Sequence, residues 1–225
     1  QRNFVGRGVG FVPLMSEHAG FQRSVCQSDS DNWPRYVVGS NSDPQFPGGI
    51  SGEYFTAQHT QQDIEIRQLD SLAPAAPRPW ATFKGSRRLS RTGYFESARL
   101  FYGQPPLDSN RQLMASLSVQ TEQQKQTYTL QPQAPINSLT ILDSAARRIR
   151  LDFSISNELP LYGVSLESKK GIIVDNFPLR GNDGSALRSI PTGVLQAFQQ
   201  ALDYDLIVFH FGLNVLNAQS KDYSW

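Results

Sequence analysis

The chain has 225 residues, of which 39% are hydrophobic and 18% are charged, and its formal net charge is +1. This composition is typical of a folded globular protein and excludes an intrinsically disordered chain. A net charge so close to zero provides no strong field for attracting nucleic acid or an anionic membrane, and the Arg pairs at 87–88 and 147–148 are expected to be solvated. The length allows one large domain or two small ones.

The single cysteine, Cys26, excludes an intramolecular disulfide and a cysteine-only zinc site. No apolar run approaches the roughly 18 residues that a membrane-spanning helix needs. The first three residues, Gln-Arg-Asn, provide neither an apolar signal core nor an initiator methionine, and the last residue is the apolar Trp225. We therefore expect that both ends are cut from a longer protein.

Residues 1–24 are predicted to be an N-terminal segment of an α/β unit. Gly6, Gly8 and Gly10 alternate with other residues before the apolar stretch 11–14, which indicates a loop that leads into a short extended segment. The three glycines do not form a dinucleotide-binding fingerprint, because no strand pattern precedes them and no helix pattern follows them.

Residues 25–60 are rich in Ser, Asp, Asn, Gly and Pro, which is typical of loops that join short strands. Asp29, Asp31 and Asp43 are candidate ligands of one Ca²⁺ site, because hard cations take carboxylate oxygens. No acidic residue stands at the twelfth position of an EF-hand loop, so that motif is absent from the sequence.

Residues 61–160 alternate between apolar and polar side chains in short runs that lie roughly 10–15 residues apart, which is the spacing of a sandwich or jelly roll. We therefore predict an inserted β-sandwich (jelly-roll-like) domain over residues 25–160. The runs that predict its strands are 64–69, 98–102, 113–119, 128–130, 139–142 and 149–155.

From Leu161 the pattern changes. Residues 161–167 and 171–177 are predicted strands, and residues 187–202 have helical spacing, with a break or a helix start expected near Pro191. The apolar run 205–211 predicts a buried strand of a parallel sheet. Residues 161–225 thus predict a βαβ unit, and the whole chain predicts a mixed β and α/β fold, a β-sandwich/jelly-roll insertion plus a partial three-layer, flavodoxin-like α/β unit.

A strand leading to Gly181-Asn182, a helix, and then Asp-Leu-Ile-Val-x-x-x-Gly-x-Asn resembles the middle of the SGNH (GDSL-like) hydrolases. Gly181 matches the glycine of block II, and Gly212-Leu213-Asn214 matches block III. The resemblance implies that Gly181 and Asn214 are oxyanion-hole donors, of a kind worth about 3–4 kcal/mol in the transition state. It also makes Asn182 and Gly212 candidate substrate-binding neighbours.

Three further stretches, at 6–13, 161–167 and 174–177, resemble bacterial envelope SGNH proteins that carry a β-sandwich between blocks I and II. Peptidoglycan O-acetylesterases are the best-known members of that branch. The resemblance implies a periplasmic or otherwise exported location, a glycan partner (peptidoglycan or another polysaccharide), and no cofactor or metal. It gives no oligomeric state and does not identify the sugar or the acyl group.

Two catalytic blocks of that family have no match in the chain. No Gly-Asp-Ser sequence provides a nucleophile, and neither His18 nor His59 has an Asp three residues earlier. His210 lies within the predicted central strand, so we interpret it as a packed histidine rather than a catalytic base. The chain is therefore expected to be the internal portion of a carbohydrate esterase and to be inactive as it stands.

Two alternatives come from other classes of protein. The β region is a non-catalytic glycan-binding module in one of them, and the chain is a degenerate SGNH scaffold with a structural role in the other. In the glycan-binding alternative, aromatic rings serve as platforms for sugar rings. The candidate platforms are Trp33, Tyr54, Trp80, Tyr94 and Tyr102.

Overall fold

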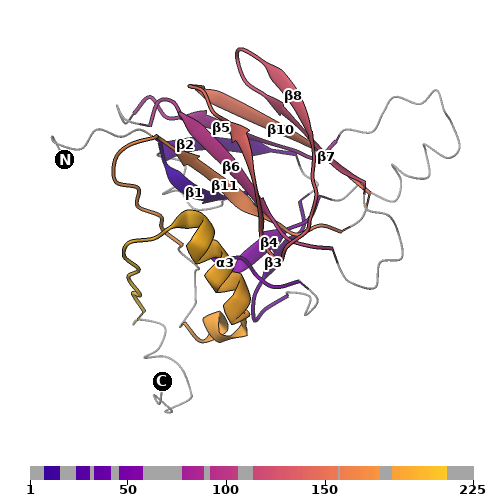
Figure 1. The fold of residues 1–225 in the computed structure, drawn as a ribbon, viewed down its shortest axis with the longest axis vertical. Helices are drawn as coiled ribbons and strands as arrows, with labels where there is room; N and C mark the ends of the chain where they lie inside the picture. The colour runs from indigo at the N-terminus through magenta and orange to yellow at the C-terminus, as the bar shows by residue number, and fades with distance from the viewer. Residues whose placement is uncertain are drawn as a thin grey trace, which may run out of the picture.

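The protein is a sandwich of two antiparallel β-sheets with a helix packed on one outer face (Figure 1). The two sheets, named A and B, face each other and enclose the main hydrophobic core. Helix α3 lies on the face of sheet A that points away from sheet B. The computed structural model describes residues 8–15, 24–30, 33–41, 46–57, 78–88, 92–105, 114–156, 158–177 and 184–211.

Sheet A contains six of the strands formed by the described residues, in the order β3-β4-β11-β6-β9, with β1 also paired to β11. Strand β11 pairs with β6 along one edge and with β1 and β4 along the other edge. Both of its edges are therefore occupied. The strands are β1 (Gly10–Pro13), β3 (Arg35–Val37), β4 (Glu53–Phe55), β6 (Ser97–Tyr102), β9 (Asn137–Leu142) and β11 (Leu161–Glu167).

Sheet B contains the other five strands of the described residues, in the order β2-β5-β10-β7-β8. In β10, buried residues alternate with more exposed ones along all eight positions, as expected for a strand with one face on the core and one face in solvent. The strands are β2 (Val25–Asp29), β5 (Trp80–Gly85), β7 (Ala115–Gln120), β8 (Lys125–Thr129) and β10 (Arg148–Ile155).

Strand β11 is buried on both faces. Leu161, Val164 and Leu166 belong to the core between the sheets, whereas Tyr162 belongs to a second apolar cluster beneath α3. Because both faces are covered, the strand is apolar at nearly every position and lacks the alternation of β10.

The 3₁₀ helix η1 (Ser185–Ser189) and helix α3 (Thr192–Leu202) cover sheet A. Pro191 directly precedes α3, which confirms the helix start predicted there, since proline fixes a φ suitable for a helix start and lacks the N–H that a helix interior needs. The buried Phe198 ring contacts the rings of Phe11, Phe101 and Tyr162, with centroids 5.3–6.3 Å apart. None of the helices in the described residues is long and apolar enough to cross a membrane.

The segment after β11 is joined to β1 by a half-buried carboxylate. Asp175 accepts hydrogen bonds from the Phe11 backbone N–H at 2.8 Å and from the Tyr204 hydroxyl at 2.5 Å. Gly10 has a φ of 88°, and a Cβ at this position would overlap the Asp175 carboxylate. Only glycine therefore suits position 10, on both conformational and steric grounds.

The predicted mixed fold with a partial three-layer, SGNH-like α/β unit is wrong. Residues 161–167 form the central strand of an antiparallel sheet in a β-sandwich, and not the first strand of a parallel sheet. The strand predicted at 161–167 is confirmed as β11, but it is antiparallel to its neighbours, with sheet B covering one face and α3 the other. With both edges of β11 occupied, no parallel strand can pair beside it.

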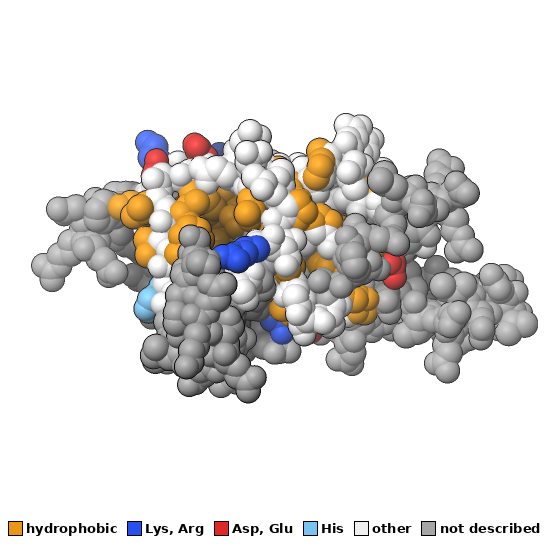
Figure 2. All heavy atoms as spheres, turned by 90° about the horizontal axis from the view of Figure 1, so that it is seen from below, with side chains coloured by type: hydrophobic (Ala, Val, Ile, Leu, Met, Phe, Trp, Pro, Cys, Tyr) orange, Lys and Arg blue, Asp and Glu red, His pale blue; other side chains and the backbone are white. Residues whose placement is uncertain are grey.

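The strands predicted at 171–177 and 205–211 are also wrong. Neither segment forms a strand, and their apolar side chains are largely exposed, with 77% exposure for Val174 and Leu206 and 71% for Phe209. Figure 2 shows hydrophobic side chains gathered on this underside of the molecule. A short apolar run is compatible with a buried strand, but burial also requires a free sheet edge or face to receive it. The predicted strand at 64–69 lies outside the described residues.

Candidate functional site

The outer face of sheet B is a polar face built by five strands. Alternation along each strand places hydrophobic residues toward sheet A and polar residues toward solvent. Register then brings residues of neighbouring strands directly opposite one another. The outward side chains are Cys26 and Ser28 on β2, Trp80, Thr82 and Lys84 on β5, Arg148, Arg150, Asp152 and Ser154 on β10, Ser116, Ser118 and Gln120 on β7, and Lys125, Thr127 and Thr129 on β8.

An aromatic ring, a guanidinium group and a carboxylate meet near the middle of this face. The Arg150 guanidinium lies over the Trp80 ring, 4.4 Å from its centroid. The same guanidinium donates three hydrogen bonds to Asp152, between 2.8 and 3.1 Å. Asp152 is also the register partner of Trp80. We call these three residues the Trp80 cluster.

The two charged side chains of the Trp80 cluster remain accessible to a ligand, with exposures of 31% for Arg150 and 21% for Asp152. The Trp80 backbone is held by neighbours, since its carbonyl accepts from the Trp33 indole N–H at 3.1 Å and its N–H donates to the Ser30 hydroxyl at 3.0 Å. The cluster is thus partly open to solvent and rests on a fixed strand. Such a combination of an apolar ring with a few fixed polar groups suits recognition of a small polar ligand.

Two buried hydroxyl groups flank the Trp80 cluster. Thr82 is 4% exposed and is the register partner of Arg150, and Ser118 is 9% exposed and is the register partner of Asp152. Within the described part of the chain, neither hydroxyl oxygen has a hydrogen-bond partner. A buried polar group without a partner costs stability, so this arrangement is expected where a ligand or water supplies the missing bond.

The aromatic residues predicted as sugar platforms lie in different environments. Tyr54 and Tyr102 are buried, and the Tyr54 ring stacks on Tyr36 with centroids 4.8 Å apart. Trp33 packs edge-on against the core residue Phe153 at 5.4 Å. Tyr94 is half-buried. Of these candidates, Trp80 is the one that lies on the open face of sheet B, beside charged groups suited to sugar hydroxyls.

The sites predicted by resemblance to SGNH hydrolases cannot be placed. The candidate oxyanion-hole residues Gly181 and Asn214 and the candidate substrate neighbours Asn182 and Gly212 all lie outside the described residues. His210 lies inside them and is exposed, so it is not the packed histidine of a central strand.

The candidate calcium ligands are only partly described. Asp29 lies on β2, whereas Asp31 and Asp43 lie outside the described residues. Within the described ranges, no three His, Cys, Asp or Glu side chains are grouped so that they could hold a metal ion. The calcium hypothesis therefore stays a prediction.

A cluster of half-buried polar groups on the α3 side of sheet A makes hydrogen bonds and an ion pair within the fold. Burial raises the pKa of Asp175, and the hydrogen bonds from Tyr204 and from the Phe11 N–H oppose that rise. Burial, and then the hydrogen bond to Asp175, raise the pKa of Tyr204. Arg99 donates to the Ala201 carbonyl at 2.6 Å and pairs with Glu167 at 3.5 Å. These groups join α3 and its flanking segments to sheet A.

A hollow of about 450 Å³ lies between α3 and the segment that follows it, and its lining is mainly apolar. Asp205 provides the only charged side chain among its lining residues, and Gln196 and Gln199 provide amides. It offers no pairing of an aromatic ring with opposite charges like that of the Trp80 cluster. The lining residues are Thr192, Leu195, Gln196, Gln199, Tyr204, Asp205 and Ile207.

The fold and site define the chain as a β-sandwich with a polar outer sheet face. No family model matches the sequence, and no curated protein matches it either. Among solved structures, a family 89 glycoside hydrolase from Clostridium perfringens, in complex with its substrate GlcNAc-alpha-1,4-galactose, is similar at a TM-score of 0.32 and 11% identity over 69% of this chain and 15% of that chain. Tailspike protein 4 of bacteriophage CBA120, in its enzymatically active domain, is similar at a TM-score of 0.32 and 12% identity over 70% of this chain and 21% of that chain.

The chain thus spans about a fifth or less of the length of these two structures. A TM-score of 0.32 is too low to establish a common fold. Neither the sugar ligand nor the enzymatic activity named for these proteins therefore transfers to this chain.

Proposed function

We propose that this chain is a carbohydrate-binding β-sandwich and that the outer face of sheet B, centred on the Trp80 cluster, holds the glycan. The observation that carries the proposal is the meeting of the Trp80 ring, the Arg150–Asp152 pair and the two unpartnered hydroxyls on one solvent-facing sheet surface. Chemistry of this kind matches a sugar, which presents both an apolar ring face and hydroxyl groups.

Each part of the site has a role that its chemistry dictates. One face of the Trp80 indole is covered by the Arg150 guanidinium, so a pyranose ring would stack on the other face of the indole or displace that guanidinium. The Asp152 carboxylate accepts hydrogen bonds from sugar hydroxyls, and the Arg150 guanidinium donates to them. The Thr82 and Ser118 hydroxyls are buried, so they can bond a water or a sugar hydroxyl only when the side chains around them move on binding.

The charged groups of the site favour binding over chemistry. The Trp80 cluster contains one carboxylate, Asp152, and that carboxylate is held in an ion pair by Arg150. Glycoside hydrolysis in most families needs two carboxyl groups on opposite sides of the scissile bond. The proposed role is therefore recognition of a glycan, and not its cleavage at this face.

The test is a binding measurement on the full chain with insoluble peptidoglycan and a panel of soluble polysaccharides. Trp80→Ala should weaken binding at least about tenfold, as expected for truncation of a central aromatic anchor. Asp152→Asn preserves the size of the side chain and should also weaken binding, which guards against a folding defect in the Trp80 variant.

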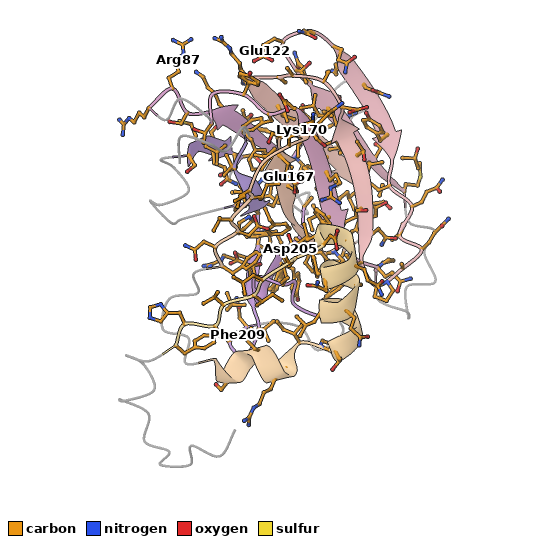
Figure 3. The ribbon with its side chains drawn as sticks, turned by 60° about the vertical axis from the view of Figure 1, so that its left-hand side comes forward. Arg87, Glu122, Glu167, Lys170, Asp205 and Phe209 are labelled. Carbon is orange, nitrogen blue, oxygen red and sulfur yellow. The ribbon has the colours of Figure 1, made fainter. Side chains whose placement is uncertain are left out.

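Phe209→Ala is the matched control, because Phe209 is an exposed aromatic residue outside the two sheets, at the end of the molecule opposite Arg87 (Figure 3). This variant should bind as the unaltered chain does. The proposal fails if the chain binds no glycan in the panel, or if the Trp80 and Asp152 variants bind as tightly as the unaltered chain while thermal unfolding shows that they are folded.

The esterase function predicted by resemblance to SGNH hydrolases stays a prediction, since its residues lie outside the described part of the chain. It needs a protein that also contains a serine nucleophile. In such a protein, Asn214→Ala should lower turnover of an activated acetyl ester by about 10²–10³-fold, because an oxyanion-hole donor acts in the transition state. Unchanged turnover would remove Asn214 from the site.

A further inference from the structure

The two arginine pairs that are far apart in the sequence come together at one end of sheet B. The Gly85 N–H donates to the Arg147 carbonyl at 2.8 Å, which joins the end of β5 to the start of β10. Lys84 and Arg148 are direct register partners on the outer face. We call the five cations at this end the basic edge: Lys84, Arg87, Arg88, Arg147 and Arg148.

The side chains of the basic edge are exposed, and their charges are not neutralised by neighbours. Within the described residues, none of the five forms an ion pair. The carboxylates of nearby turns are in part engaged elsewhere, since Asp143 pairs with Lys169 at 2.9 Å and Glu96 accepts from the Lys169 N–H. Glu122, on the turn between β7 and β8, lies at the same end of the molecule as Arg87 (Figure 3).

The fold tolerates an unfavourable contact at this place. Like charges directly opposite each other on neighbouring strands are destabilising, and Lys84 faces Arg148 in this way. A bound anion would relieve the repulsion, and arginine guanidinium groups bind carboxylate and sulfate oxygens through paired hydrogen bonds. The basic edge is therefore complementary to a negatively charged ligand.

The basic edge continues the surface of the Trp80 cluster. Trp80 and Lys84 lie on the same face of β5, four residues apart, which corresponds to roughly 13 Å along a strand. Arg150, in the cluster, and Arg148, in the basic edge, are likewise on the same face of β10. An extended ligand that stacks on Trp80 can therefore reach the basic edge without leaving sheet B.

We propose that the basic edge makes the site on sheet B selective for acidic glycans, whose sugar rings carry carboxylate or sulfate groups. This inference rests on the proposed function. A glycan is favoured over a nucleic acid because the net charge of the chain is only +1 and the basic edge itself contains no aromatic ring on which a base could stack.

The experiment uses two matched pairs of ligands that differ only in charge. Oligogalacturonate is compared with its methyl ester, and dextran sulfate is compared with dextran. The unaltered chain should bind the acidic member of at least one pair about tenfold more tightly than its neutral partner, and this preference should weaken as the salt concentration rises. The pair that shows the preference identifies the acidic group.

The double variant Lys84→Ser, Arg148→Ser should lose the preference for the acidic ligand and retain binding of the neutral one. The charge-conserving double variant Lys84→Arg, Arg148→Lys should keep most of the preference. Equal binding of the acidic and neutral members of both pairs by the unaltered chain would overturn the inference while leaving the proposed function intact.

Three other outcomes would overturn one or both of the proposals. Absence of binding to all four ligands and to the wider glycan panel would overturn both proposals. If Trp80→Ala leaves the preference for the acidic ligand unchanged, the basic edge attracts anions independently of the Trp80 cluster. That result would overturn the proposal that the two form one glycan site. Equally tight binding of single-stranded DNA at the same salt concentration would overturn the assignment to a glycan.

Discussion

The outer faces of the two sheets differ in what covers them. The outer face of sheet A lies beneath α3 and is built from aromatic rings around Phe198. The half-buried Asp175 carboxylate on this side has hydrogen-bond donors on both oxygens, whereas the buried side-chain oxygens of Thr56, next to β4, and Gln199, on α3, have no partner among the described residues. The outer face of sheet B is open and carries the Trp80 cluster, where the buried hydroxyls of Thr82 and Ser118 have no partner among the described residues.

This difference separates a structural face from a binding face. Polar groups that join elements of a fold are normally paired, as the half-buried Asp175 is. Polar groups that serve a ligand are left open and cost stability until the ligand is bound. Substitutions on the outer face of sheet B should therefore change the stability little and weaken ligand binding. Substitutions on the outer face of sheet A should lower the stability and leave binding unchanged.

The largest expected effect is on the sheet A side. Phe198→Ala removes a fully buried ring that contacts Phe11, Phe101 and Tyr162, and it should lower the free energy of unfolding by about 3–5 kcal/mol. Denaturant unfolding measures this change. Leu206→Ala, at a residue that is 77% exposed, is the control and should change the free energy of unfolding by less than about 0.5 kcal/mol. Similar losses in both variants would contradict the assignment of the Phe198 ring to the packed core beneath α3.

A smaller effect concerns the pH dependence of the sheet A cluster. Because burial raises the pKa of Asp175 above its ordinary value of 3.8, the folded state binds this proton more tightly than the unfolded state does. Its contribution to stability is therefore largest below about pH 3.8 and is lost as the pH rises through the pKa of the folded state. Relative to Asp175→Asn, the unaltered chain should gain stability as the pH falls from neutral toward 4.

Denaturant unfolding at several pH values measures the difference in free energy between the two chains. Asp205→Asn, at an exposed residue, controls for the loss of one carboxylate from the net charge. A difference between the unaltered chain and Asp175→Asn that does not change over this pH range would show that the Asp175 carboxyl titrates alike in the folded and unfolded states.

The smallest change in stability is expected on the sheet B side. Thr82→Val replaces a buried, unpartnered hydroxyl with a methyl group of similar size, so it should raise the free energy of unfolding by about 1 kcal/mol. It should also weaken glycan binding about 3–10-fold, which is the value of one hydrogen bond. Thr127→Val, at an exposed position of the same face, is the control. A loss of stability with unchanged binding would mean that the Thr82 hydroxyl serves the fold.

Several elements were predictable because their local pattern carries the necessary information. The alternation in residues 149–155 and 113–119 predicted strands, and the structure confirms them as β10 (Arg148–Ile155) and β7 (Ala115–Gln120). The proline at 191 predicted a helix start, and α3 begins at Thr192. In each case the determining interaction lies within a few residues of the chain.

The candidate site was predictable only in part. Trp80 was one of five aromatic candidates, and nothing in the sequence distinguished it from Tyr54 or Tyr102, which are buried. Arg150 and Asp152 are two residues apart in a predicted strand. That spacing places both on the same face, so their ion pair could have been predicted. The pairing of Thr82 with Arg150 and of Ser118 with Asp152 depends on register between strands distant in the sequence, and composition does not encode register.

By itself, the sequence determined the β-rich character of the chain, the positions of its alternating strands and the start of its helix, since all of these follow from local periodicity and from proline stereochemistry. Only the tertiary structure decided that residues 161–167 join an antiparallel sheet, that residues 205–211 stay exposed, and that distant arginine pairs form one basic edge. Local sequence states which residues favour burial or a strand. Which sheet edge is free, and which side chains then become neighbours, is decided by pairing across the whole chain.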